Sequence, residues 1–198
     1  TCTAPKGNRV LIQTHSGGPG AVAADACDRA GLKLPSISDA TRRKLADYIP
    51  HTGSMNNPVD ITFSKRNIDY FVDIPQILLA EEGADALLVY LMMPRRAIRQ
   101  ALTDMGVNSD ETSAEAAQFI ESQTRVMADI MAGAAKPFIG FSYEASEHPF
   151  IKGLRKAGAP VLAGPNRAAR ALCALYLYGR LRDKILASSG RYRSSMRI

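Results

Sequence analysis

Three glycines and a proline follow the first apolar run of the chain. The stretch Thr14–Gly20 reads T-H-S-G-G-P-G, comes directly after Val10-Leu11-Ile12, and is followed by a helical pattern. Glycine lets backbone N–H groups approach an anion without a Cβ atom in the way, and a helix start adds unpaired donors and partial positive charge. Pro19 has no N–H to donate but presets a first helical turn. These residue types suit a loop that binds phosphate through Ser16, Gly17, Gly18 and Gly20.

The spacing alone supports a second interpretation equally well. The G-x-G-x-x-G pattern of dinucleotide-binding loops is absent, and no G-K-[ST] completes a P-loop. The stretch is therefore either a phosphate-binding loop or a tight structural turn. His15 stands at the end of the expected strand, where it either donates a hydrogen bond to an anion or only packs against its neighbours.

The elements that must position this stretch alternate between strand and helix patterns. Short apolar runs predict strands at Arg9–Thr14, Val59–Phe63, Ala86–Leu91, Phe138–Ser142 and Pro160–Ala163. Helical periodicity and capping residues predict helices at Gly20–Ala30, Asp39–Tyr48, Ile68–Glu82, Arg95–Thr103, Ser113–Ala134, His148–Ala157 and Asn166–Leu186.

A glycine follows three of the expected helices, at Gly31, Gly83 and Gly158, as a left-handed C-cap requires. Short returns from helix to strand favour parallel βαβ units. The sequence therefore predicts an α/β fold of the flavodoxin-like, doubly wound kind, with a mainly parallel five-stranded sheet. Ligands bind beyond the carboxyl ends of such strands, where the glycine stretch lies.

Composition and charge divide the chain and narrow its partners. Of the net charge of +6, three charges are Arg191, Arg193 and Arg197 in a Ser/Arg-rich end. We expect residues 1–8 to be a linker from a removed upstream domain, 9–186 one domain, and 187–198 a disordered basic tail. No basic stripe with aromatics suggests nucleic acid, and no apolar run suggests a membrane span. The three cysteines lack metal-ligand spacing, as in a cytoplasmic protein with reduced thiols.

The order of motifs resembles the NDP-forming acyl-CoA synthetases, relatives of succinyl-CoA synthetase. In that family a G-N-R strand, a loop ending in G-G-P-G and an A-A-D helix follow one another, as they do between Gly7 and Ala26. Asn57-Pro58-Val59-Asp60 is similar to the family's N-P-V-D. Further segments keep the family's order: Ala30–Pro35, Ala84–Val89, Lys136-Pro137, Ala157–Val161 and Asn166–Leu172.

The resemblance implies the C-terminal ligase-CoA domain of an acid–thiol ligase, with this chain inactive alone. The intact enzyme would use CoA and ATP with Mg²⁺ and carry a phosphoryl group to a small carboxylic acid on a mobile histidine. The partners implied are the phosphohistidine, CoA-binding and nucleotide-grasp domains. A homo-oligomer is compatible with them, and the sequence leaves the oligomeric state open. The glycine stretch would hold the phosphoryl group, supported by His15, Asn57 and Asp60. No catalytic residue or metal ligand is identified in this segment.

Several alternatives stay open. Asn57 and Asp60 either support the phosphate or only form a turn. His51-Thr52-Gly53 resembles half of the family's S-H-T-G, but Pro50 replaces the serine and a loop histidine is expected. The residues after N-P-V-D and the 107–134 extension depart from the family's pattern, which leaves the acyl substrate open.

A different class of function shares the same motifs. Some protein lysine acetyltransferases carry this whole ligase-like array as a non-catalytic module that senses acyl-CoA or small molecules. An upstream S-H-T-G motif would favour the enzyme, whereas an added acetyltransferase domain would favour the sensor.

Overall fold

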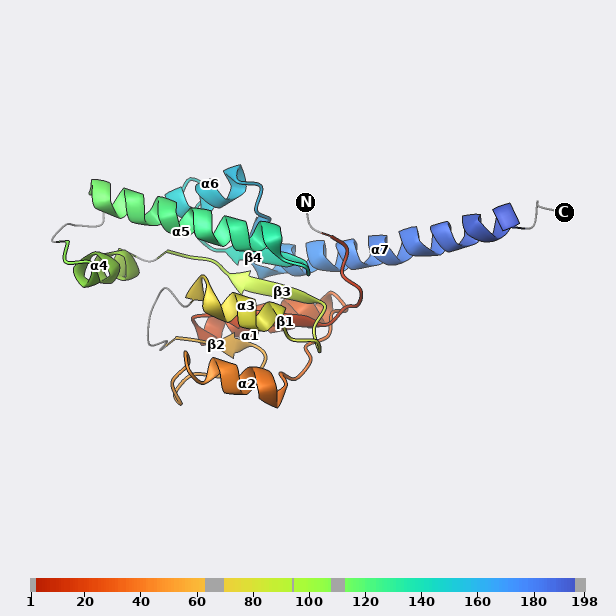
Figure 1. Cartoon of the computed structure of the whole chain (residues 1–198), viewed down its shortest axis with the longest axis horizontal. Coiled ribbons are helices and arrows are strands. Elements are labelled where there is room, and N and C mark those ends of the chain that lie inside the picture. The colour runs from red at the N-terminus through yellow and green to blue at the C-terminus, as the bar shows by residue number, and fades with distance from the viewer. Residues whose placement is uncertain (1–2, 63–69, 94, 108–112, 195–198) are drawn as a thin grey trace.

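The computed structural model describes residues 3–62, 70–93, 95–107 and 113–194. At its centre is a five-stranded sheet in the order β2-β1-β3-β4-β5, with all neighbouring strands parallel (Figure 1). The strands are β1 (Val10–Thr14), β2 (Val59–Asp60), β3 (Ala86–Tyr90), β4 (Phe138–Ser142) and β5 (Val161–Ala163). This strand order is that of flavodoxin-like sheets, so the predicted fold class is confirmed.

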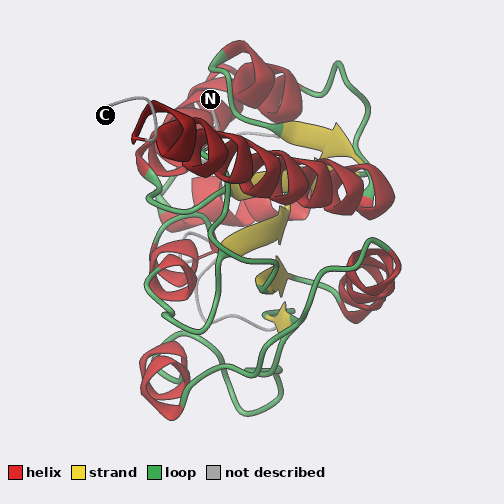
Figure 2. Cartoon of the chain, turned by 90° about the vertical axis from the view of Figure 1, so that its right-hand side faces the viewer, coloured by secondary structure: helices red, strands yellow, loops and turns green. Residues whose placement is uncertain are grey.

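Helices cover both faces of the sheet and bury a separate apolar core on each (Figure 2). One face packs against α1 (Gly17–Arg29) and α7 (Pro165–Ser194), through side chains such as Ile12, Leu88 and Leu172. The other face carries the remaining helices: α2 (Asp39–Leu45), α3 (Asp73–Leu79), α4 (Arg95–Asp104), α5 (Ala114–Gly133) and α6 (Pro149–Lys156). The central strands are buried along their whole length, as expected for a covered parallel sheet.

Several element boundaries differ from those predicted. The first helix begins at Gly17 rather than Gly20, because Pro19 fits within a first helical turn. The second strand is only two residues long, and α2 ends at Leu45. The start predicted for the third helix, at Ile68, lies outside the described residues. The last helix continues past Leu186 to Ser194, so the expected tail begins within a helix; residues 195–198 lie outside the described residues.

The predicted glycine caps are confirmed at two of three positions. Gly31 and Gly158 adopt positive φ angles of 78° and 81° directly after α1 and α6. Gly83 does not; its N–H donates instead to the Glu81 carboxylate at 3.0 Å. Ser38, the N-cap of α2, donates to the same carboxylate from its hydroxyl at 2.6 Å. Burial alone would raise the pKa of Glu81, but these hydrogen bonds outweigh it and lower that pKa to about 2.

Two further features concern the surface. Across the described residues, no helix combines the length and apolar character that crossing a bilayer requires. The C-terminal half of α7 projects beyond the body of the molecule (Figure 1). Near the start of this projection, Gly179 packs so closely on the N-terminal segment that a Cβ there would lie 2.6 Å from the Ala4 Cβ.

Candidate functional site

The first strand brings the chain to the carboxyl edge of the sheet. It ends at Thr14, and α1 begins at Gly17. The Thr14 hydroxyl fixes the turn between them: it donates to the Ser16 carbonyl at 2.7 Å and accepts the Ser16 N–H at 3.1 Å. Because Thr14 is fully buried, this turn anchors the start of α1 to the sheet.

The start of α1 offers two unpaired backbone donors. Gly17 and Gly18 occupy its first two positions and are exposed, and within the described ranges neither N–H donates to an acceptor. Pro19 has no N–H, and Gly20 donates to the Ser16 carbonyl at 3.2 Å. The first turn itself holds no acidic residue, so the helix dipole adds a partial positive charge at this end of α1. This end of α1 is suited to bind an anion.

The geometry narrows the predicted set of phosphate donors. The sequence predicts backbone donation by Ser16, Gly17, Gly18 and Gly20. In the structure the N–H groups of Ser16 and Gly20 are bonded within the chain, because the stretch forms the first turn of a helix rather than an open loop. Gly17 and Gly18 remain as donors. The Ser16 hydroxyl beside them makes no capping hydrogen bond.

Asp60 borders the same site from the neighbouring strand. It pairs with Thr14 in the register of β1 and β2. Its Oδ1 accepts the N–H of Thr62 at 3.0 Å and the Thr62 hydroxyl at 2.5 Å. The other oxygen, Oδ2, would lie 3.4 Å from a Cβ built on Gly17. The Asp60 carboxylate, oriented by Thr62, therefore lies beside the start of α1. It can accept a hydrogen bond from an N–H of an incoming group.

His15 lies between two tyrosines at the edge of the site. Its ring centroid is 5.2 Å from that of Tyr70 and 4.8 Å from that of Tyr90, and its Nε2 is buried with no hydrogen-bond partner. Burial lowers the pKa of His15, and a backbone hydrogen bond and the nearby charge of Asp60 offset this only in part. At neutral pH His15 is therefore an uncharged imidazole whose Nε2 does not face solvent.

Asn57 belongs to the framework of the site. Its Oδ1 accepts the Ile12 N–H at 3.0 Å, and its Nδ2 donates to the carbonyls of Val10 at 2.8 Å and Pro35 at 3.1 Å. The side chain thus pairs with the β1 backbone as a strand residue would, and the peptide bond that follows, Asn57–Pro58, is cis. With these hydrogen bonds made, Asn57 holds the N-P-V-D segment against β1 rather than facing an anion.

The sequence reasoning missed three residues of this edge. Thr14 fixes the helix start, and Tyr70 and Tyr90 enclose His15, with the Tyr70 hydroxyl donating to the Tyr90 carbonyl. A threonine two residues before a helix N-cap is a recognisable signal for a local side-chain turn. Nothing in the local sequence indicates the tyrosines, because they come from separate segments brought together by the fold.

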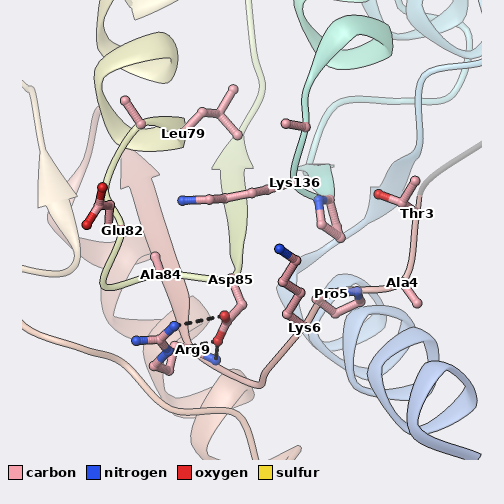
Figure 3. A pocket seen from close by; sticks show the side chains of 13 residues that line it. Thr3, Ala4, Pro5, Lys6, Arg9, Leu79, Glu82, Ala84, Asp85 and Lys136 are labelled. Carbon is pink, nitrogen blue, oxygen red and sulfur yellow. Dashed lines mark hydrogen bonds and ion pairs between the residues drawn. The ribbon is translucent and has the colours of Figure 1, made fainter. Parts of the chain in front are cut away.

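A cavity of about 560 Å³ lies at the opposite, amino edge of the sheet (Figure 3). There Arg9 forms two side-chain hydrogen bonds to Asp85, each 2.9 Å long, which lower the pKa of that carboxyl. Lys136 donates to the Glu81 carbonyl at 2.6 Å. These residues belong to the G-N-R, A-D-A and K-P motifs. The motifs therefore tie together the amino ends of β1, β3 and β4.

Within the described residues, no cluster of three or more His, Cys, Asp or Glu side chains is arranged to hold a metal ion. Cys27 is fully buried in α1, and burial raises its pKa to about 12. Neither the described acidic, His and Cys side chains nor Cys27 therefore adds a metal site or a reactive thiol to the start of α1.

A parallel sheet of flavodoxin-like strand order, with a glycine-led helix start at its carboxyl edge, defines the class of this protein as a flavodoxin-like α/β domain. The sequence of residues 10–89 matches the ligase-CoA domain family. Over these residues the chain is similar to the ligase-CoA domain, and the resemblance to ADP-forming acyl-CoA synthetases is confirmed.

Two curated relatives and one solved structure illustrate the similarity. ADP-forming acetate–CoA ligase II subunit alpha of Pyrococcus furiosus is 39% identical over 90 residues, covering 46% of this chain and 20% of the relative. ADP-forming acetate–CoA ligase I of Archaeoglobus fulgidus is 31% identical over 180 residues, covering 90% and 22%. The dinucleotide-forming acetyl-coenzyme A synthetase 1 of Ca. Korarchaeum cryptofilum, in complex with phosphate and ADP, has a TM-score of 0.68 at 22% identity, covering 94% of this chain and 36% of that one.

The chain thus spans about a fifth of the length of these curated relatives. The likeness to the solved structure, at 22% identity, supports the fold.

Proposed function

We propose that this chain is the ligase-CoA part of an ADP-forming acyl-CoA synthetase, an acid–thiol ligase that joins a small carboxylic acid to CoA. The observation that carries the proposal is the start of α1, where two unpaired glycine N–H groups lie at the carboxyl edge of the sheet. The relatives named ADP-forming acetate–CoA ligase support the reaction class. In the intact enzyme, other domains would bind CoA and ATP with Mg²⁺ and would carry the phosphohistidine.

The role of α1 is electrostatic. A phosphoryl group arriving on a histidine from another domain would accept hydrogen bonds from the N–H groups of Gly17 and Gly18. The donors are already oriented before the group arrives, so little reorganisation is needed, and a preorganised donor stabilises transition-state charge. Gly18 has nothing within 4 Å of its Cβ direction, which leaves space for the incoming group.

Two side chains complete the proposed site. Asp60 would accept the free N–H of the incoming imidazole, since its carboxylate stands beside Gly17 and is oriented by Thr62. His15 would line the site as an uncharged imidazole that packs between the rings of Tyr70 and Tyr90. A neutral imidazole there avoids an extra cation that would hold the phosphoryl group too strongly for transfer.

The test is Gly18→Val in the complete enzyme, with Gly133→Val as the matched control. Both glycines have open space around the Cβ direction and lie in helices, but Gly133 ends α5, far along the chain from the proposed site. The branched side chain at position 18 should obstruct the anion and lower phosphohistidine formation or turnover by at least ~10-fold, equivalent to ~1.4 kcal/mol. Unchanged kinetics in a folded Gly18→Val enzyme would mean that the glycine stretch is only a structural turn and does not bind the phosphoryl group.

One activity assay and one labelling experiment test whether the phosphohistidine and the nucleotide site lie outside this chain. The purified chain should make no acyl-CoA from ATP, acid and CoA, because we identify no nucleophile or nucleotide site among its described residues. With the complete enzyme, labelled ATP should mark a histidine outside this segment. A label on His15 or His51 would refute the assignment.

The donor pair itself can be tested on the chain alone. Titration with inorganic phosphate should shift the backbone amide NMR signals of Gly17 and Gly18 more than those of other exposed glycines such as Gly133. If the shifts at all exposed glycines are equal, the start of α1 does not bind the anion.

A further inference from the structure

The cavity at the amino edge of the sheet, which we call the amino-edge cavity, has walls of two kinds (Figure 3). Apolar side chains that include Leu79, Ala135 and Pro137 line one part of it. Charged side chains line the rest: Lys6, Arg9, Glu82, Asp85 and Lys136. A volume of about 560 Å³ and an apolar lining with a few polar groups are typical of sites for small organic molecules.

The N-terminal segment 3–6 forms one wall of the amino-edge cavity and packs closely on the body. Two glycines make room for this packing. A Cβ at Gly7 would collide with the Asp85 carboxylate, and one at Gly179 would lie 2.6 Å from the Ala4 Cβ. Pro5, between these two contacts, is buried. The cavity is therefore bounded by a close-packed segment and is part of the fold.

The acids of the amino-edge cavity are already bonded or solvated. Both oxygens of Asp85 accept hydrogen bonds from the Arg9 side chain, each 2.9 Å long. Glu82 is exposed, so water screens its charge. Neither acid therefore neutralises the lysines of the cavity through a hydrogen-bonded ion pair.

The two lysines retain donors that the chain does not use. Among the described residues Lys6 makes no hydrogen bond or ion pair, and Lys136 spends one of its three N–H bonds on the Glu81 carbonyl, at 2.6 Å. Burial lowers the pKa of Lys136, because lost hydration outweighs the nearby charges of Asp85 and Glu81. Figure 3 shows the two lysines reaching into the same cavity from different segments. An incoming anion would thus meet two sets of unused charged donors.

We propose that the amino-edge cavity binds a small organic carboxylate with a short apolar chain, whose carboxylate is held by Lys6 and Lys136. The chain would lie against Leu79 and Ala135, where its burial adds affinity. A second cavity of about 540 Å³ shares Leu79, Ala80 and Ala135 with the first, so the apolar wall continues between α3 and α5. The site lies at the opposite edge of the sheet from the start of α1, and it does not depend on the proposed ligase function.

Two other classes of ligand fit the amino-edge cavity less well. A metal cation or an amine would meet three cations, and the buried carboxylate that could bind it, Asp85, is already bonded to Arg9 through both oxygens. Inorganic phosphate would satisfy the lysines but would leave the apolar wall uncovered.

The experiment titrates the ¹⁵N-labelled full chain with sodium hexanoate and follows its backbone amide signals by NMR. The signals of Ala84, Asp85 and Lys136 should shift along one saturation curve. Hexanoate should bind at least ~10-fold more tightly than acetate or inorganic phosphate, since burial of about two methylene groups supplies such a factor. Hexylamine, which has the same chain and a positive charge, should not bind. A hexanoate shift confined to Gly17 and Gly18 would place the anion at the start of α1 and would overturn the proposal.

Four variants separate the lysine charges from general effects on the fold. Lys136→Met keeps most of the apolar stem and should weaken hexanoate binding at least ~10-fold, and Lys6→Met should weaken it about 3-fold because that ammonium is more exposed. Glu82→Gln removes an acid near the ligand and should tighten binding. Lys156→Met, at an exposed lysine of α6, is the matched control and should change nothing.

The Lys6→Met result does not depend on the hydrogen bond that Lys136 makes to the backbone, so a fold defect in Lys136→Met would leave the test intact. Wild-type affinity for hexanoate in a folded Lys6→Met or Lys136→Met chain would overturn the proposal. So would equal binding of hexanoate and hexylamine, or the absence of any saturable shift at the amino-edge cavity. Circular dichroism of each variant would verify that the fold is retained.

Discussion

The close contact between α1 and β1 predicts opposite effects of alanine at two neighbouring glycines. A Cβ added at Gly20 would lie 2.8 Å from the Thr14 Cγ2, whereas one added at Gly18 would meet nothing within 4 Å. The Thr14 side chain is buried and held by two hydrogen bonds of its hydroxyl to Ser16, so its methyl group is fixed. Gly20→Ala should therefore destabilise the protein, and Gly18→Ala should stabilise it.

The difference in stability between the two variants follows from two contributions, the helix propensity of alanine and the overpacking against Thr14. Replacing glycine by alanine in a helix gains up to about 1 kcal/mol of stability, and both variants share this gain. Only Gly20→Ala adds overpacking, which typically costs about 1–3 kcal/mol. The free energies of unfolding of the two variants should thus differ by about 1–3 kcal/mol.

The free energies of unfolding of both variants can be measured by urea denaturation. Because the chain has no Trp, unfolding is followed by far-UV circular dichroism rather than by tryptophan fluorescence. Thr14→Ser is the matched background, because serine keeps the hydroxyl and removes Cγ2. In that background most of the cost of Gly20→Ala should vanish, giving a coupling free energy of at least about 1 kcal/mol. If Gly20→Ala stabilises as much as Gly18→Ala, or if the two sites show no coupling, α1 is not held against β1 as described.

Three further predictions concern polar groups that are buried or half-buried. Burial lowers the pKa of His15 below the 6.5 of an unfolded chain, so stability should fall as pH drops from about 7 to 5; His15→Asn should flatten this slope in a series of denaturation measurements, and an unchanged slope would contradict the assignment. Glu81, with a pKa of about 2 against 4.5 unfolded, stabilises the fold above pH 4.5 and loses this contribution toward pH 2, so Glu81→Gln should remove that part of the acid titration curve. Asn57→Ala should cost about 2–4 kcal/mol in chemical denaturation, whereas Asn56→Ala, at an exposed side chain, should cost under about 0.5; equal losses would contradict the framework role.

The fold was predictable because its signals are local. Continuous apolar runs of strand length such as Ala86–Tyr90 indicate strands covered on both faces, and the helix patterns between them favour parallel crossovers. The helix start at Gly17 was not predicted, because glycine has low helix propensity. Its propensity matters little there, since the first residues of a helix need no intrahelical N–H partner.

The site was predictable only in outline. The glycine stretch and Asp60 were found from the sequence and lie together in the structure. The framework role of Asn57 was not, because its side chain bonds to Val10, far away in the sequence, and only the folded sheet brings them together. The expected left-handed cap at Gly83 was wrong for a similar reason: Glu81, positioned by Ser38, supplies a nearby acceptor for its N–H.

Pro19 has a consequence for how long the start of α1 would retain what it binds. Without the proline, a third N–H would face the same point as those of Gly17 and Gly18. Each hydrogen bond to a charged group contributes about 1.5–3 kcal/mol, so a third donor would slow dissociation roughly 10-fold or more. In an enzyme that passes a phosphoryl group between domains, a site that held it longer would limit the turnover rate. Under the proposed function, the proline would therefore keep the residence time of the phosphoryl group short, which suits transfer between domains better than storage.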